Sequence, residues 1–248
     1  MTTSTVSNSL YGAPDLYDAE FGGYRADVPF YRHVLETRPG RCMEGGCGTG
    51  RLYFFLEEPV EYLGVDGSTA MLRRFSRRAR AAVPPLLAGD LTSLPLRSNA
   101  AQVVVLAYNV LQHMMTPVML RAALAEAARV APVVALDTFM PPLPGMVRRD
   151  EEFGYVEQRR HPLGHILDVA EQTELDEGTQ VQLTRLRFQD AAGDAPVHTV
   201  TRRLWSADAL RAAITGAGLR VAELWGDVDA TAWDARAPRF MAVCERAS

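Results

Sequence analysis

The sequence predicts an α/β fold whose mostly parallel, seven-stranded sheet has helices on both faces and carries a small antiparallel insert. Short apolar stretches alternate with helical patterns from residue 41 to residue 137, as in proteins whose parallel strands are joined by covering helices. Residues 101–107 are apolar apart from Gln102, which is typical of a strand buried on both faces. At residues 140–145 three prolines and a glycine end this alternation, and stretches with the period-two pattern of antiparallel strands follow.

The elements of the main sheet are predicted in chain order. The first is a helix at residues 28–37, because Val28, Tyr31 and Leu35 share a helical face. The alternating region then gives strands at 41–44, 62–65, 86–88, 101–107 and 133–137, and helices at 49–57, 69–82 and 117–130.

The last third of the chain divides into an insert and a return to the main sheet. Residues 146–162 are charged and irregular, and three antiparallel strands are predicted after them, at 164–175, 179–189 and 197–205. Ser206 then caps a helix that stops at Gly218. Strands at 220–225 and 239–244 complete the main sheet.

Composition restricts the function. The 248 residues are 48% hydrophobic, which suits one large domain or one domain with an insertion. The net charge is −4, and a mildly acidic chain is poorly suited to binding nucleic acid, whose affinity comes mainly from phosphate neutralisation. Three cysteines, Cys42, Cys47 and Cys244, lack metal-ligand spacing and cannot all pair, so we expect a cytoplasmic protein without a metal site.

The first ten residues lack the pattern of a signal peptide, and the chain contains no apolar run of about 18 residues, so no membrane association is expected. The expected assembly is a monomer or a homodimer. Five arginines on the helix at 69–82 form a charged face, which we expect to be solvated, with nucleic-acid binding as a lesser alternative: Arg73, Arg74, Arg77, Arg78 and Arg80.

The glycine-rich stretch after the first core strand is the strongest candidate for a binding site. Gly46, Gly48 and Gly50 follow Glu44 at alternate positions, so a ligand can lie against a backbone that has no Cβ atoms. The next helix directs its free N–H groups at the same place. A dinucleotide fingerprint would require glycine where Arg51 stands, which counts against an enzyme that uses NAD or FAD.

Acidic residues end the next two strands. Asp66 follows the second strand, where a carboxylate can accept hydrogen bonds from both hydroxyls of a ribose. The alternative is a helix cap, although Ser68 or Thr69 can supply that without Asp66. Asp90 follows the third strand and is either a ligand-binding acid or a simple turn residue.

Asn109 and His113 follow the fourth strand, at the edge of the sheet where ligands of open α/β folds bind. A histidine with a pKa near 6.5 can serve as a base at neutral pH. The alternative is a structural histidine bonded to the backbone.

Together these stretches resemble the motifs of the class I S-adenosylmethionine (SAM) methyltransferases. Residues 44–50 resemble motif I, residues 63–72 the "gvD-x-S-x-x-mL" motif, and residues 88–96 the "GD…LP" segment. Residues 109–113 resemble the "NxxxH" stretch of small-molecule methyltransferases such as glycine N-methyltransferase and sugar N,N-dimethyltransferases. The resemblance implies a Rossmann-like fold, SAM as the cofactor and a small-molecule acceptor.

The resemblance also implies roles for individual residues. Tyr17 and Asp18 match an N-terminal "YD" pair whose tyrosine lies near the reacting methyl group, so Tyr17 and His113 are the catalytic candidates. The candidates for cofactor binding are Tyr17, Tyr24, Glu44, Gly46, Cys47, Gly48, Gly50, Asp66, Gly67, Met71, Asp90, Leu91 and Asn109. The aromatic segment 11–30 is expected either to close over the cofactor or simply to cover the sheet.

These expectations divide the chain into four parts: an N-terminal segment with a lid helix (1–38), a SAM-binding core (39–140), an antiparallel insert that walls the acceptor pocket (141–205), and a closing helix with two strands (206–248). The expected reaction is methyl transfer to an N or O atom of a small metabolite, in secondary metabolism. Two alternatives remain open. One is a cyclase or lyase that uses SAM on the same fold, and the other is a SAM-binding subunit without catalytic activity.

Overall fold

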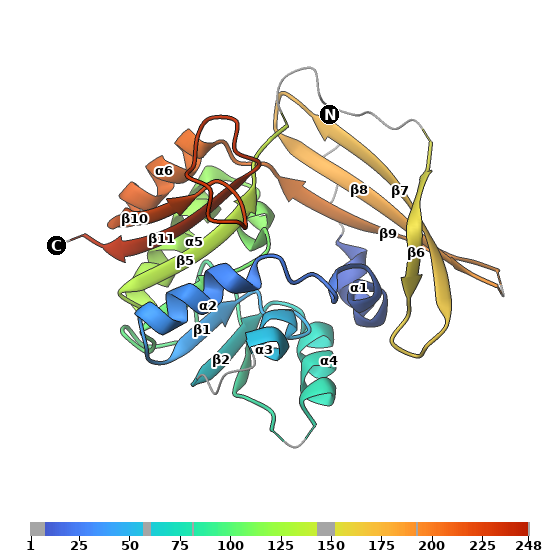
Figure 1. The fold of residues 1–248 in the computed structure, drawn as a ribbon, viewed down its shortest axis with the longest axis horizontal. Helices are drawn as coiled ribbons and strands as arrows, with labels where there is room; N and C mark the ends of the chain where they lie inside the picture. Colours follow the sequence, from blue (N-terminus) through green and yellow to red (C-terminus); the bar gives the residue numbers. More distant parts are fainter. Residues whose placement is uncertain (1–7, 57–60, 81, 143–151, 192, 248) are drawn as a thin grey trace.

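The computed structural model describes residues 8–56, 61–80, 82–142, 152–191 and 193–247, which form two sheets (Figure 1). The larger sheet has seven strands in the order β10-β11-β5-β4-β1-β2-β3. Strands β1 to β5 run parallel, and β11 is antiparallel to both of its neighbours. These strands are β1 Cys42–Gly45, β2 Tyr62–Asp66, β3 Leu86–Ala88, β4 Val103–Leu106, β5 Val133–Phe139, β10 Leu219–Trp225 and β11 Arg239–Arg246. The predicted main sheet is confirmed.

Helices cover both faces of this sheet, as predicted. The side chains of β4 alternate between two buried clusters: Val104 joins the cluster beneath α5 and α6, and Val103 joins the cluster that contains residues of α2, α3 and α4. Ser68, Thr116 and Ser206 cap three of the helices by accepting a backbone N–H. The helices are α2 Val28–Thr37, α3 Arg51–Leu56, α4 Thr69–Ala79, α5 Pro117–Val130 and α6 Ala207–Gly216.

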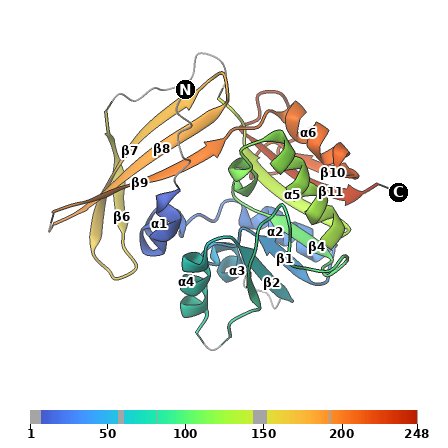
Figure 2. The ribbon, with the colours of Figure 1, turned by 180° about the vertical axis from the view of Figure 1, so that it is seen from behind.

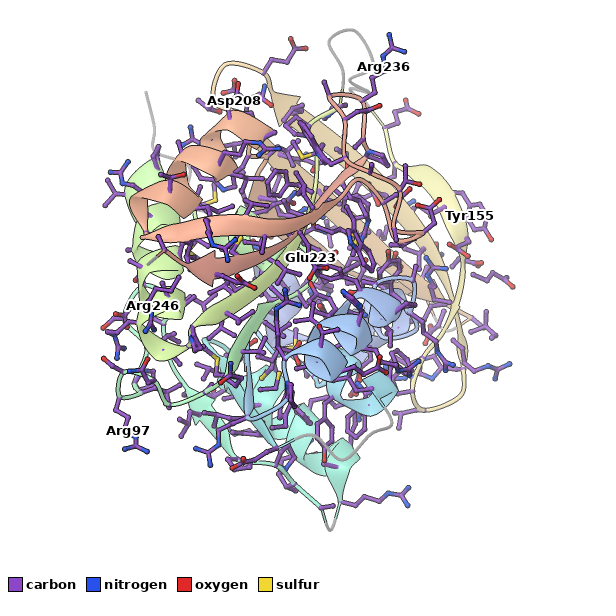
Figure 3. All side chains as sticks on the ribbon, turned by 60° about the vertical axis from the view of Figure 1, so that its left-hand side comes forward. Arg97, Tyr155, Asp208, Glu223, Arg236 and Arg246 are labelled. Atoms are coloured by element: carbon purple, nitrogen blue, oxygen red, sulfur yellow. The ribbon has the colours of Figure 1, made fainter. Side chains whose placement is uncertain are left out.

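The insert has four antiparallel strands, so the prediction of three was wrong. The missed strand, β6 Gly154–Arg160, lies at the edge of the sheet and pairs with β7. It is exposed along nearly its whole length, and Figure 3 shows Tyr155 on its outer side. An edge strand held by backbone pairing does not need alternating apolar residues, so its sequence lacks the expected signal. The other strands are β7 Ile166–Asp176, β8 Val181–Asp190 and β9 Gly193–Arg203.

The N-terminal segment packs against the insert and lies beside α4 (Figures 1 and 2). It contains a 3-10 turn, η1 Ser9–Gly12, and a helix, α1 Pro14–Phe21. Leu10 is fully buried in an apolar cluster with residues of β7, β8 and β9. The backbone N–H groups of Thr199 and Thr201 on β9 donate to Ser9 Oγ (2.9 Å) and Asn8 Oδ1 (2.7 Å). The segment is therefore part of the insert's own core.

A buried ion pair joins the start of α2 to the start of α3. Arg51 donates to both carboxylate oxygens of Asp27, at 2.7 and 2.6 Å, and also to the carbonyl of Tyr24 at 2.9 Å. The side chains of Asp27 and Arg51 are 0% and 7% exposed. A buried, bidentate pair of this kind depends on both partners, because either charge alone would be unsolvated.

Among the helices of the described residues, none has both the length and the apolar character needed to cross a membrane.

The Asp27–Arg51 pair can be tested by denaturation. Asp27→Ala leaves a buried guanidinium without its counter-charge, and we expect the free energy of unfolding to fall by about 3–5 kcal/mol. Glu61→Ala is the control, because Glu61 pairs with Arg41 at the surface, and its loss should stay below about 1 kcal/mol. Equal, small losses in urea titrations of both variants would contradict the importance given to the buried pair.

Candidate active site

A cavity of about 590 Å³ opens at the carboxyl ends of β1, β2 and β4 and is walled on its other side by η1, α1 and β9. Its volume lies in the range typical of small-molecule sites. It brings together most of the residues that the sequence singled out: Tyr17, Glu44, Gly46, Cys47, Gly48, Asp66, Gly67, Met71, Asp90, Leu91, Asn109 and His113. Gly50 and Tyr24 do not line it.

Gly46, Gly48 and Gly50 form the glycine turn, and they differ in what surrounds them. Gly48 has a φ of +54°, and a Cβ built on it would meet no atom within 4 Å, so its backbone is open to the cavity. Gly50 has a φ of +83°, and a Cβ there would lie 2.5 Å from the ring of Phe75. Gly50 thus permits close packing of α4 behind the turn, without contact with the cavity.

Tyr24 supports the site from behind. Its ring packs on Tyr108 with 4.9 Å between ring centroids, and the guanidinium groups of Arg51 and Arg239 lie over it at 5.5 and 5.4 Å. Tyr24 therefore lies in a second layer, next to a residue that does line the cavity.

Asp66 holds the glycine turn in place. Its two carboxylate oxygens accept the backbone N–H groups of Gly48 (2.8 Å) and Ser68 (2.7 Å). Burial raises the pKa of Asp66, and these two hydrogen bonds oppose that rise. Ser68 supplies the cap of α4, so Asp66 is not needed for that purpose. Each carboxylate oxygen keeps a lone pair that can accept a further hydrogen bond.

Asp90 fits both of its interpretations. Its Oδ1 accepts the backbone N–H and the hydroxyl of Thr92, each at 2.8 Å, which is an Asx turn. The same turn carries Asp90 and Leu91 to the cavity wall.

Glu44 is a buried carboxyl group with one close partner. The hydroxyl of Tyr62 donates to it at 2.5 Å. Burial raises the pKa of Glu44 to about 7, although the bond from Tyr62 opposes the shift. The group therefore titrates near neutral pH and responds to any charge that enters the cavity.

The chain leaves β4 through two residues with left-handed backbone conformations, Tyr108 (φ 52°) and Asn109 (φ 65°). Such conformations are sparsely populated by residues other than glycine and need support from their surroundings. Asp137 accepts the N–H of Tyr108, and Asn109 Oδ1 accepts the N–H of Phe139 at 2.7 Å. The carboxamide oxygen of Asn109 thus stabilises the turn as well as lying at the cavity.

His113 and Tyr11 form a pair that the sequence only half revealed. The Tyr11 hydroxyl lies 2.8 Å from His113 Nε2, and the two rings meet edge to face. Burial, assisted by the charge of Arg202, lowers the pKa of His113 to about 4, so the expected value near 6.5 is wrong. The imidazole is therefore neutral at pH 7. Tyr11 was one aromatic residue among several in its segment, and its spacing gave no signal for a site.

Tyr17 faces the cavity, and its neighbour Asp18 fastens α1 to the core. Asp18 accepts from Thr49 Oγ1 (2.5 Å), Arg74 Nε (2.8 Å) and Arg78 Nη1 (3.1 Å). Its side chain is 7% exposed. The arginine face predicted to be solvated thus contributes two members to a partly buried cluster.

Arg51, Arg202 and Val200 also line the cavity and were not predicted to belong to the site. Arg51 appeared only as the residue that breaks a dinucleotide fingerprint. Arg202 and Val200 lie on β9, whose sequence matches no motif.

Comparison with known proteins agrees with this geometry. Residues 43–132 match the sequence family described as "Methyltransferase domain". The matched residues include the glycine turn, Asp66, Asp90, Asn109 and His113. No protein of curated function matches the chain. The elements η1, α1 and β9, which wall the other side of the cavity, lie outside the match.

Solved structures share the whole fold. The CcbJ methyltransferase from Streptomyces caelestis is 20% identical, with a TM-score of 0.81 over 98% of this chain and 100% of that chain. The sugar N-methyltransferase KedS8 from Streptoalloteichus sp ATCC 53650 is 21% identical, with a TM-score of 0.74 over 100% and 98%. CalS10 from Micromonospora echinaspora, described as a SAM-bound amino pentose methyltransferase, is 20% identical, with a TM-score of 0.69 over 99% and 100%.

At these identities the likeness establishes the fold, and the predicted class I methyltransferase fold is confirmed. The resemblance to SAM-dependent methyltransferases inferred from the sequence is confirmed as well.

The attachment of α1 can be measured by hydrogen exchange. Asp18→Asn removes charge-assisted bonds to Arg74 and Arg78, and amides of α1 should exchange about tenfold faster or more. Asp15→Asn is the matched control, because Asp15 is half exposed and bonds only to Arg74 among the described residues. Equal exchange in the two variants would show that α1 is held by apolar packing alone.

The raised pKa of Glu44 predicts a pH-dependent stability. Between its ordinary value of 4.5 and about 7 the folded state keeps a proton that the unfolded state has released. Stability from this group is therefore present at low pH and falls by about 3 kcal/mol as the pH rises through that window. The lowered pKa of His113 makes stability rise with pH instead. This contribution is the same in wild type and in Glu44→Gln, so it cancels in the comparison. The difference in unfolding free energy between these two proteins, measured from pH 4.5 to pH 7.5, should show the fall. A constant difference would mean that Glu44 is ionised throughout.

Proposed function

We propose that this protein transfers the methyl group of SAM to an N or O atom of a small metabolite, in secondary metabolism. One observation carries the proposal: a single cavity joins the glycine turn and the carboxylates of the methyltransferase domain to the Tyr11–His113 pair. Two similar structures support this kind of acceptor, since KedS8 is a sugar N-methyltransferase and CalS10 is an amino pentose methyltransferase involved in calicheamicin biosynthesis.

The residues present suit SAM. Gly48 leaves room for a ligand against the backbone, and the remaining lone pairs of Asp66 suit ribose hydroxyls. Met71 and Leu91 offer apolar contact to an adenine ring, beside Asp90. When bound, SAM supplies an electrophilic methyl group on a positively charged sulfur.

The protein's part in the reaction is to bind, orient and exclude water. Glu44 and Asn109 face the space left for the methionine portion of the cofactor, where a carboxylate favours an ammonium group. Tyr11, Tyr17 and Phe21 wall the cavity with aromatic rings, which exclude water from the reacting atoms. Holding the nucleophile in line with the methyl group removes much of the barrier without any chemistry by the protein.

We assign His113 and Tyr11 to the acceptor. In the tautomer of the neutral imidazole that is protonated at Nδ1, Nε2 accepts a hydrogen bond from the Tyr11 hydroxyl. The phenol oxygen is then free to accept a hydrogen bond from the acceptor's N–H or O–H group. With a pKa of about 4, His113 is a weak base and does not hold an added proton as an imidazolium at pH 7. Its proposed role is therefore to orient Tyr11 and the acceptor. The proton released on methylation then passes to solvent.

Product analysis tests the proposal. Purified protein is incubated with methyl-labelled SAM and a metabolite extract, and the products are identified by mass spectrometry. S-adenosylhomocysteine together with a labelled methylated metabolite is the expected result. Methylthioadenosine would instead indicate a cyclase or lyase, and SAM binding without turnover would indicate a regulatory subunit. Calorimetry with SAM, S-adenosylhomocysteine and NAD should show binding of the first two only.

Three variants separate the cofactor half of the cavity from the acceptor half. His113→Ala should lower kcat by about 10²-fold or more, the scale expected when an orienting group is lost, while leaving the affinity for S-adenosylhomocysteine within a factor of a few. Asp66→Ala should lose about 1.5–3 kcal/mol of that affinity. Tyr11→Phe should resemble His113→Ala, since it removes the same hydrogen bond. If His113→Ala weakens cofactor binding as much as it lowers kcat, the assignment to the acceptor is wrong.

A further inference from the structure

The wall of the cavity opposite the glycine turn carries Arg202, which has no counter-charge among the described residues. Arg202 and Val200 both line the cavity from β9, as expected for residues two apart on one strand. Among the described residues, no carboxylate forms an ion pair with Arg202. Its Nη2 lies 3.5 Å from Thr184 Oγ1, a long contact, and its buried Nε has no hydrogen-bond partner in that part of the chain.

The charge of Arg202 acts on the acceptor end of the cavity. It helps to lower the pKa of His113, and it opposes the rise that burial causes in the pKa values of Tyr11 and Tyr108. Arg202, Tyr11 and His113 line the same cavity, and charges interact strongly across a water-poor space, so the guanidinium acts on the Tyr11–His113 pair.

We infer that Arg202 binds an anionic group of the methyl acceptor, a carboxylate or a phosphate. The inference rests on the proposed function and narrows its acceptor to metabolites that carry such a group near the methylated atom. A guanidinium presents its N–H groups in a fork that matches both anions, and a pair formed in a partly buried site is stronger than one in water.

The carboxylate of the cofactor is the competing partner. The groups that suit the cofactor come from the core sheet and the glycine turn, on the other side of the cavity. Arg202 instead comes from the insert, on the side of Val200 and Tyr11. This separation favours the acceptor.

The experiment uses protein labelled with ¹⁵N-arginine, in which the Nε–H resonance of Arg202 is assigned from its disappearance in Arg202→Gln. Sodium acetate and inorganic phosphate are titrated into the protein with and without saturating S-adenosylhomocysteine, with sodium chloride at equal ionic strength as the reference. Arg185 lies on the neighbouring strand β8 and forms an ion pair with Glu174 at 2.6 Å. Its Nε–H resonance is the control for the titrations, and Arg185→Gln is the control variant. Calorimetry gives the affinity of each variant for S-adenosylhomocysteine.

The expected result is a saturable shift of the Arg202 resonance by acetate or phosphate in the cofactor-bound protein, and no such shift for Arg185. The anion that binds more tightly identifies the acceptor group, and Arg202→Gln should weaken its binding about tenfold or more, as expected for a lost charge-assisted bond. The affinity of Arg202→Gln for S-adenosylhomocysteine should stay within a factor of a few of the wild-type value.

Three results would overturn the inference. The first is that neither anion moves the Arg202 resonance. The second is that S-adenosylhomocysteine alone moves it and that Arg202→Gln binds that ligand about tenfold more weakly. The third is that the metabolite methylated in the product analysis carries no anionic group. Failure of the proposed function would give a different result, because wild-type protein would then bind no S-adenosylhomocysteine. The anion titration without that ligand would still show whether Arg202 binds an anion.

Discussion

The bidentate pair between Asp27 and Arg51 is the constraint on which the site depends. Arg51 is the first residue of α3, directly after the glycine turn, and its guanidinium also holds the carbonyl of Tyr24 and lies 4.9 Å from the ring of Tyr108. One cation therefore fixes the N-terminal segment, the glycine turn and the exit of β4 relative to one another. Its burial makes the arrangement stiff, because every departure exposes a charge to an apolar environment.

A second buried pair continues this network beneath the cavity. Asp137 on β5 accepts from Arg239 at 2.7 Å and from the Tyr31 hydroxyl at 3.1 Å, and it also accepts the N–H of Tyr108. Burial raises the pKa of Asp137, and the neighbouring Arg239 opposes that rise. The network thus supports the left-handed backbone of Tyr108, and the floor of the site is a set of mutually dependent polar contacts.

Much of the core was predictable because its signals are local. Alternating strand and helix patterns predicted the sheet, and the acids at or just after the carboxyl ends of β1, β2 and β3 identified one edge of it. The missed features depend on neighbours distant in sequence. No pattern relates Asp27 to Arg51 or Tyr11 to His113, and β6 is held by pairing without an apolar face. The shift in the pKa of His113 likewise arises from burial by segments on either side of the cavity.

The glycines of the turn also show that a local pattern cannot predict contacts with residues distant in sequence. Alternate spacing predicts an open turn at Gly46, Gly48 and Gly50, but it cannot distinguish a glycine that faces a ligand from one that faces Phe75. That distinction depends on how α4 packs behind the turn, and α4 is placed partly by its arginines around Asp18.

The cavity lies between two parts of the chain that have separate cores. Among the described residues, the apolar cluster around Leu10 and Phe188 shares no member with the two clusters of the main sheet. Side chains on β9 can therefore change without disturbing the packing around β1, β2 and β4. Under the proposed function, a new surface on the insert would change which acceptor binds, while the glycine turn and its carboxylates would keep their geometry. The chemistry and the selectivity proposed for this chain could then evolve independently.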